Sequence, residues 1–94
     1  MNRIQSLVLI GREWTDSFGN TYYTTTVVVN GVAIELNPRP RYGHGSSVHW
    51  HAAESMLRDS GYSVPSRPML WRACQDRGIS THCEVIRVGR RKDL

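Results

Sequence analysis

Four histidines and two cysteines are the residues of this chain that could bind a metal ion. His44, His49 and His51 lie close together in the sequence, and His82 precedes Cys83. Zinc-binding helices present ligands three or four residues apart, whereas residues two apart on a helix do not face each other. The spacing therefore indicates a histidine-bearing loop and helix start, and we expect no metal and no cofactor. It leaves open whether the four histidines bind a metal together.

Residue types used in nucleophilic catalysis are present, but no motif frames them. The run Tyr42-Gly43-His44-Gly45 is similar to a phosphate-binding loop, yet it lacks the lysine and the preceding buried strand that such loops need. Cys83 falls in an expected strand, where a buried structural thiol is more common than a nucleophile. We therefore expect a protein that is not an enzyme.

Basic residues gather in the last third of the chain. The formal net charge is +4, and arginine, which suits bidentate pairing with phosphate or carboxylate, outnumbers lysine eleven to one. Such a surface with interleaved aromatic residues is typical of nucleic-acid binding, but no recognised DNA- or RNA-reading motif is present. Contact with nucleic acid and a solvated or acidic-partner-facing surface both stay open. These basic residues are Arg67, Arg72, Arg77, Arg87, Arg90, Arg91 and Lys92.

Aromatic residues are numerous for so small a core. Trp71 lies off the apolar side of its expected helix, and Phe18 lies at an expected loop tip. Large exposed aromatic residues beside arginines match the composition of binding hot spots, although Trp71 could also cap the edge of the core. The residues expected to bind a partner are Phe18, Tyr42, Arg67, Trp71, Arg72, Arg77, Arg87, Arg90 and Arg91.

The elements that position these residues begin with a strand-rich meander. Ile4–Ile10 is aliphatic on both faces, as a central strand buried on two sides should be, and the strand could extend to Trp14. Thr21–Val29 and residues 32–36 read as two further strands. Asn30-Gly31 between them is the strongest short-range hairpin signal, because both central residues of a type I′ turn need φ > 0.

The second half of the chain predicts two helices and one more strand. A proline-rich segment ends the meander, and Ser46 or Ser47, after a tight loop that begins at Tyr42, could cap a helix over residues 48–60 that stops at Gly61. Ser66 and Pro68 open a second helix, which Gly78 closes. Met69, Leu70, Ala73 and Cys74 form the apolar side of that second helix.

The order β-β-β-α-α-β predicts one α+β domain over residues 1–89. We expect an antiparallel sheet of about four strands, the last over residues 81–88, with two helices packed on one face, and a basic C-terminal tail over residues 90–94. With 94 residues there is no room for a second core. No segment reads as a targeting or membrane-spanning stretch, so Cys74 and Cys83 are expected to be reduced.

A string of short motifs resembles a family of small uncharacterised phage and prophage proteins. The motifs are Arg12-x-Trp14, Gly19-Asn20-Thr21-Tyr22, Val29-Asn30-Gly31, Tyr42-Gly43-x-Gly45 and Gly61-Tyr62-x-x-Pro65, and the resemblance covers roughly residues 4 to 65. It implies a virus-encoded accessory protein in the cytoplasm of a bacterial host. Such proteins commonly bind and block host machinery, and many antagonise defence systems, as anti-CRISPR proteins do.

Two functions are therefore expected. The favoured one is a small accessory protein that binds and inhibits or modulates a host protein or ribonucleoprotein complex by stoichiometric binding. The alternative is a nucleic-acid-binding module that uses the arginine-rich last third. The oligomeric state stays open, and a homodimer through a sheet edge is compatible with the sequence.

Overall fold

The computed structural model describes residues 3–35, 40–64 and 69–94. Arg67 of the expected binding residues lies outside these ranges, as do Ser66, Pro68 and the expected strand residue Leu36. The elements are β1 (Ser6–Thr15), β2 (Thr21–Val29), β3 (Val32–Glu35), β4 (Arg41–Tyr42), α1 (Ser46–Asp59), α2 (Leu70–Asp76), β5 (Ser80–Arg87) and a short 3₁₀ helix η1 (Arg91–Asp93).

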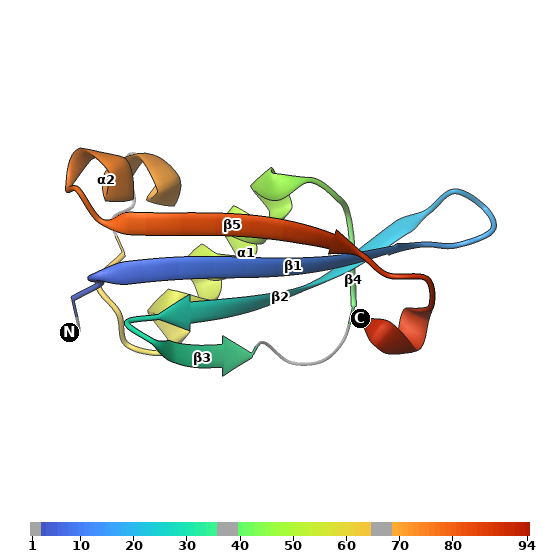
Figure 1. Ribbon diagram of the computed structural model, residues 1–94, viewed down its shortest axis with the longest axis horizontal. Coiled ribbons are helices and arrows are strands. Elements are labelled where there is room, and N and C mark those ends of the chain that lie inside the picture. The colour runs from blue at the N-terminus through green and yellow to red at the C-terminus, as the bar shows by residue number, and fades with distance from the viewer. Residues whose placement is uncertain (1–2, 36–39, 65–68) are drawn as a thin grey trace.

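Five strands form one mixed sheet with the order β3-β2-β1-β5, and β4 pairs with the start of β2 (Figure 1). The α+β class and the single domain are as expected, but the expectation of a wholly antiparallel sheet is wrong. The pairings of β1, β2, β3 and β4 are antiparallel, whereas β5 runs parallel to β1 in the register Ser6↔Ser80 to Glu13↔Arg87. Tyr42, the first residue of the expected tight loop, belongs to β4.

The path of α1 explains the parallel pairing. Gly45, just before α1, contacts Glu13 at the far end of β1, and the residues after α1 and α2 reach the end of the sheet where β1 starts. A strand that enters from that end must run in the same direction as β1, as in other helical crossovers. The crossover therefore decides the direction of β5.

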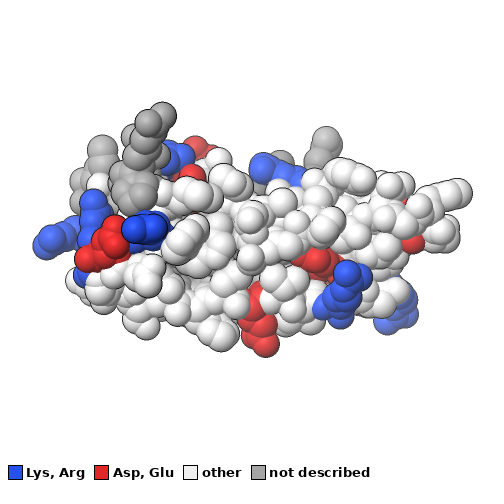
Figure 2. All heavy atoms as spheres, turned by 90° about the horizontal axis from the view of Figure 1, so that it is seen from above, with Lys and Arg blue, Asp and Glu red and all other residues white. Residues whose placement is uncertain are grey.

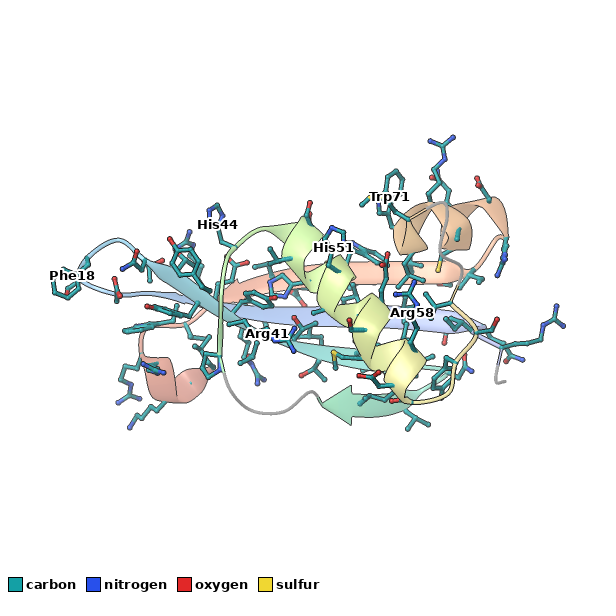
Figure 3. The ribbon with its side chains drawn as sticks, turned by 180° about the vertical axis from the view of Figure 1, so that it is seen from behind. Phe18, Arg41, His44, His51, Arg58 and Trp71 are labelled. Carbon is teal, nitrogen blue, oxygen red and sulfur yellow. The ribbon has the colours of Figure 1, made fainter. Side chains whose placement is uncertain are left out.

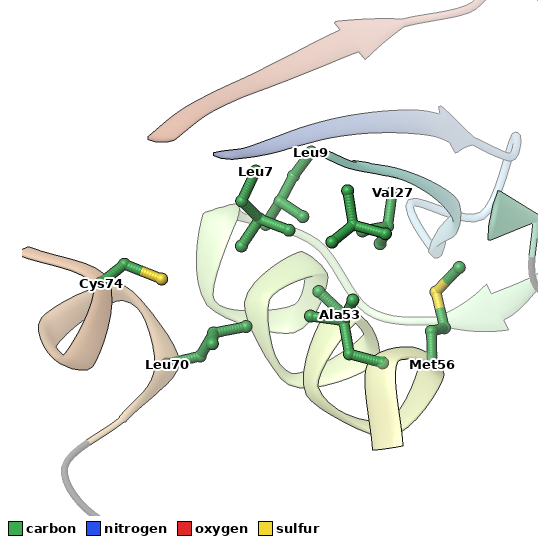
Figure 4. Packing of buried hydrophobic residues seen from close by; sticks show 9 residues of the cluster. Leu7, Leu9, Val27, Ala53, Met56, Leu70 and Cys74 are labelled. Carbon is green, nitrogen blue, oxygen red and sulfur yellow. The ribbon is translucent and has the colours of Figure 1, made fainter. Parts of the chain in front are cut away.

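The core lies between one face of the sheet and the two helices (Figure 4). Alternate residues of β1 and β2 point into it, because side chains along a strand alternate between the two faces. Ala53 and Leu57 of α1 lie in it at the expected helical spacing, and Trp50 packs against its margin. The cluster consists of Leu7, Leu9, Val27, Val29, Ala53, Met56, Leu57, Leu70 and Cys74.

Neither α1 nor α2 covers the opposite face of the sheet (Figure 1). Leu7 and Leu9 of β1 are fully buried, but Val8 and Ile10 on the other face are only half-buried. The expectation that β1 is buried on both faces is therefore wrong, because both helices pack on the same side. The aliphatic residues of this second face stay partly open to solvent.

The hairpin between β2 and β3 forms at the expected turn. Asn30 and Gly31 both have positive φ, 52° and 82°, as a type I′ turn requires. The Asn30 side chain adds a role that the sequence did not indicate: its Oδ1 accepts the N–H of Gln5 and Ser6, and its amide donates to the Arg3 carbonyl. This turn therefore fixes the start of β1 beside the end of β2.

The start of α1 differs from the expected one, whereas its end does not. α1 begins at Ser46 after Gly45 and lacks a side-chain cap, so the expected serine cap is not used. Its end follows expectation, since the Tyr62 N–H donates to the Leu57 carbonyl just past Gly61. At the start of α2, Glu54 of α1 accepts the Leu70 N–H at 3.0 Å, which ties the two helices together. Neither described helix is long and apolar enough to cross a membrane.

Both cysteines are free thiols. Cys74 is buried in the core and Cys83 is half-buried on β5. Burial raises the pKa of the Cys74 thiol, and the positive charge of Arg77 opposes this rise in part. Burial also raises the pKa of Cys83. A raised pKa means that the fold favours the neutral thiol, so both cysteines stay protonated at neutral pH.

We expect both thiols to react slowly with iodoacetamide in the folded protein at pH 7 and much faster in urea. The stability that the neutral thiols contribute is full at neutral pH and declines as the pH rises above the ordinary thiol pKa of ~8.5. Mass spectrometry of protein alkylated at pH 7 to 10 measures the reaction rate of each thiol. Equal rates in folded and unfolded protein would contradict the burial of the thiols.

Gly11 of β1 lies directly against His49 of α1. A Cβ atom at this position would fall on the imidazole ring of His49, far inside van der Waals contact. Only glycine therefore leaves room for His49 to lie flat against β1. The sequence did not indicate this role, because a glycine in a strand has several possible causes.

We expect Gly11→Ala to lower the free energy of unfolding by about 1 to 3 kcal/mol, because overpacking forces His49 and α1 to shift. Urea denaturation followed by circular dichroism measures the change. Gly89→Ala is the matched control, since nothing lies within 4 Å of a Cβ added there. Equal stability of the two variants would contradict the close packing of His49 on Gly11.

Candidate functional site

A buried polar network joins the sheet to the start of α1. His49 Nε2 lies 3.0 Å from Glu13 Oε2, and His49 Nδ1 lies 2.7 Å from Thr25 Oγ1. Because a carboxylate only accepts hydrogen bonds, Nε2 donates to Glu13, and Nδ1 of a neutral imidazole then accepts from the Thr25 hydroxyl. The same Glu13 oxygen accepts the Gly45 N–H at 2.9 Å. One carboxylate thus holds both the loop before α1 and the helix itself.

The strand register explains why these groups meet. Glu13 lies opposite Tyr23 and Gly11 lies opposite Thr25, so all four side-chain positions share the face that α1 covers. The imidazole of His49 also meets the Tyr23 ring edge-on, with 5.1 Å between ring centroids. This end of the covered face is therefore polar, whereas the end near Leu7 and Leu9 is apolar.

A hydroxyl, an imidazole and a carboxylate in this order are the parts of a catalytic triad. In this chain all three residues are buried in the interior, with exposed fractions of 5% for Thr25, 0% for His49 and 4% for Glu13. A substrate has no path to the Thr25 hydroxyl in this arrangement. The geometry therefore supports a structural role, in which each buried side-chain nitrogen and oxygen of the described residues has a hydrogen-bond partner.

The four histidines lie in different surroundings. His49 is buried, while His44 and His51 lie on the outside of the molecule, so the two helical histidines point in different directions as their spacing predicted (Figure 3). His82 is exposed on β5. Within residues 3–35, 40–64 and 69–94, no three His, Cys, Asp or Glu side chains are placed to hold a metal ion.

The expected partner-binding residues separate into two groups at opposite ends of an elongated molecule of 41 × 20 × 19 Å. Figure 3 shows Phe18 at the tip of the β1–β2 hairpin and Trp71 on α2 near the other end. The first group also contains Tyr42, Arg87, Arg90 and Arg91, and the second contains Arg72 and Arg77. The expected residues therefore do not form one continuous surface.

The first group lies around a stacked aromatic cluster. The rings of Trp14 and Tyr22 stack with 6.0 Å between centroids, and Tyr42 meets Tyr22 edge-on at 5.8 Å. The guanidinium carbon of Arg91 lies 5.9 Å from the centre of the Tyr22 ring. We call Trp14, Phe18, Tyr22, Tyr42 and Arg91 the hairpin platform. Trp14 and Tyr22 were not among the expected residues, although their equal distance from the turn at residues 16–20 could have paired them.

Phe18 is presented by an ordered loop. Asp16 Oδ1 accepts the N–H of Phe18 and of Asn20, each at 2.9 Å, and the Asp16 and Gly19 N–H groups donate to backbone oxygens across the turn. The Phe18 side chain is 87% exposed, the largest exposure among the large hydrophobic residues described. Its ring therefore contributes little to the fold while its position is fixed.

The basic residues near the platform make contacts within the chain. Arg87 donates to Thr15 Oγ1 at 3.2 Å, and Arg90 pairs with Asp93 across 3.4 Å on the exposed surface. An exposed pair of this kind contributes little to stability. Together with Arg91 on Tyr22, these contacts fold the C-terminal residues back beside the hairpin (Figure 1).

Trp71 of the second group lines a groove between α1 and α2. The groove has a volume of about 550 Å³ and is lined by Trp50, Trp71, Gln75, Gly78, Ile79 and Thr81. Trp71 is 42% exposed, and Met69, expected on the buried side of its helix, is also exposed. Met69 comes just before α2, so the helical spacing that predicted its burial does not apply to it. Figure 2 shows basic residues near both ends of this side of the molecule, with uncharged surface and further charged residues of both signs between them.

Comparison of the chain with the profiles of known protein families, with curated proteins and with solved structures found no match. The resemblance to phage proteins therefore stays a prediction.

We expect Thr25→Val to lower the free energy of unfolding by about 1 to 3 kcal/mol, because it leaves His49 Nδ1 buried without a hydrogen-bond partner. Urea denaturation monitored by tryptophan fluorescence measures the loss. Thr24→Val on the half-exposed face of the same strand is the control, and we expect it to change stability by less than about 0.5 kcal/mol. The same loss in both variants would mean that the network does not hold α1.

Proposed function

We propose that this protein is a non-enzymatic accessory protein that acts by stoichiometric binding and docks its hairpin platform onto another protein. The target that the sequence resemblance suggests is a protein or ribonucleoprotein complex of a bacterial host, in the host cytoplasm. Inhibition of a defence complex, as by anti-CRISPR proteins, is one form of this proposal. The observation that carries it is the exposed Phe18 ring on a hydrogen-bonded hairpin tip.

The energetics favour Phe18 as an anchor. Burial of a phenylalanine side chain in a partner pocket contributes roughly 1.5 to 3 kcal/mol. The loop is already ordered through Asp16, so binding costs little additional conformational entropy. Tyr42, which is 71% exposed, and the nearby arginines provide the amphipathic rim that surrounds many such anchors.

A protein partner fits the platform better than nucleic acid does. Single-stranded nucleic acid binds along a continuous basic groove with open aromatic faces. Here the Tyr22 ring is stacked on Trp14 and has Arg91 over it, and the basic residues of the last third are split between the two ends. Nucleic-acid binding by Tyr42, Arg90 and Arg91 is the second candidate, because these residues combine an exposed ring with positive charge.

We expect Phe18→Ala to weaken binding to the partner by about thirtyfold, since loss of a hot-spot aromatic residue costs about 2 kcal/mol. The partner is identified by co-purification with tagged protein expressed in a bacterial host, after nuclease treatment. Isothermal titration calorimetry with the purified partner then gives the affinity and stoichiometry. Val32→Ala, which also removes an exposed apolar side chain but lies outside the platform, should bind normally.

Salt dependence separates the two candidates. Protein binding anchored by Phe18 should change little between 50 and 300 mM salt, whereas binding through phosphates weakens steeply. Normal partner binding by Phe18→Ala would contradict the proposed anchor. A shift of single-stranded DNA or RNA at low salt that Arg90→Ala and Arg91→Ala abolish, without any protein partner, would replace it with nucleic-acid binding.

A further inference from the structure

Among the residues that the structure describes, no strand pairs with the outer edge of β5. β5 ends the strand order, and of its eight residues only Cys83 is even half-buried. It contains no proline and no lysine, the residues by which many proteins block an exposed edge. A regular edge of this kind is a ready template for another strand.

The direction of the backbone N–H and C=O groups shows which residues of β5 can form hydrogen bonds at the free edge. The Val88 N–H donates to the Glu13 carbonyl of β1 at 2.9 Å. Because backbone groups alternate sides along a strand, even-numbered residues of β5 turn their N–H and C=O groups toward β1. The odd-numbered ones, Thr81, Cys83, Val85 and Arg87, turn theirs to the free edge.

We propose that β5 pairs with β5 of a second copy of this chain, antiparallel about a two-fold axis at Cys83, to form a homodimer with one continuous sheet. A two-fold axis perpendicular to the sheet keeps the helices of both copies on the same side. Two residues that pair across the axis must have their side chains on the same face of the sheet. Since side chains alternate between the faces, both residue numbers are then odd or both are even. This condition leaves few registers.

Two registers pair the largest number of β5 residues, and the charged side chains favour one of them. The register centred on Cys83 pairs Ser80 with Ile86, Thr81 with Val85 and His82 with Glu84 of the second copy. The register centred on Glu84 places two carboxylates directly opposite each other, which is destabilising. In the first register the imidazole and carboxylate meet twice, at positions where side chains are closest because the backbones are not hydrogen-bonded.

The groove beside α2 supports the same register. Thr81 lines that groove together with Trp71 and Gln75. Opposed residues of an antiparallel pair have Cβ atoms about 5 Å apart, so Val85 of the second copy would lie beside Thr81 at the mouth of the groove. Val85, 37% exposed in the single chain, would thereby be covered, and Trp71 gains a role in assembly.

The dimer would carry two hairpin platforms. Since β5 runs toward the β1–β2 hairpin and the two copies of β5 are antiparallel, the platforms lie at opposite ends of the joined sheet. Such an arrangement allows bivalent binding to a repeated or symmetric target. The inference does not rest on the proposed function, because the two surfaces are separate.

A charge exchange on β5 tests the register. We expect sedimentation velocity to detect a dimer. His82→Glu should weaken dimerisation at least about tenfold, because it places two pairs of carboxylates opposite each other. The double variant that also carries Glu84→His should restore the dimer. Both side chains are exposed, so circular dichroism should report an unchanged fold. A monomer at every concentration up to 1 mM, or a dimer that His82→Glu leaves intact, would overturn the proposal.

Further variants complete the test. Trp71→Ala should weaken dimerisation, and Arg72→Ala should not. Phe18→Ala should stay dimeric, which separates failure of the dimer from failure of partner binding. A monomer whose β5 amides become protected from hydrogen exchange only with a protein partner would overturn the homodimer in favour of strand addition by that partner.

Discussion

The hydrogen bonds of His49 to Glu13 and Thr25 couple the helix to the sheet at one defined position. Gly11 allows the imidazole to lie against β1, and the carboxylate of Glu13 also holds the loop that leads into α1. A buried polar group left without a partner here would lower the free energy of unfolding by roughly 1 to 3 kcal/mol. The whole stability of a domain is only about 5 to 15 kcal/mol. The position of α1 therefore depends on a polar contact as much as on its apolar face.

This constraint extends to both ends of the molecule. With α1 fixed near Glu13, the chain must return to the start of β1, which makes β5 parallel and leaves its outer edge open. At the other end, the long β1–β2 hairpin extends past the helix layer and presents Phe18 away from the core (Figure 3). The two surfaces proposed for binding thus follow from one choice of helix position.

The two groups of expected binding residues lie on surfaces of different character. Phe18 and Tyr42 lie near arginines that contact the hairpin, so that end combines apolar and positive surface. Trp71 instead lies beside the groove over β5. The arginine-rich last third, taken as one surface in the sequence, forms two separate regions in space, one on α2 and one beside the hairpin.

Local patterns alone determined the turn at Asn30-Gly31, the extent of β2, the helix over most of α1, and the exposure of Phe18 at a loop tip, because each depends on neighbours within a few residues. The tertiary structure decided the parallel direction of β5, the half-open second face of β1 and the grouping of Trp14, Tyr22 and Arg91. It also decided that His49 is a buried contact of Glu13, which lies 36 residues away in the sequence. Such contacts depend on how the elements pack against each other. The spacing of residues along one element therefore does not predict them.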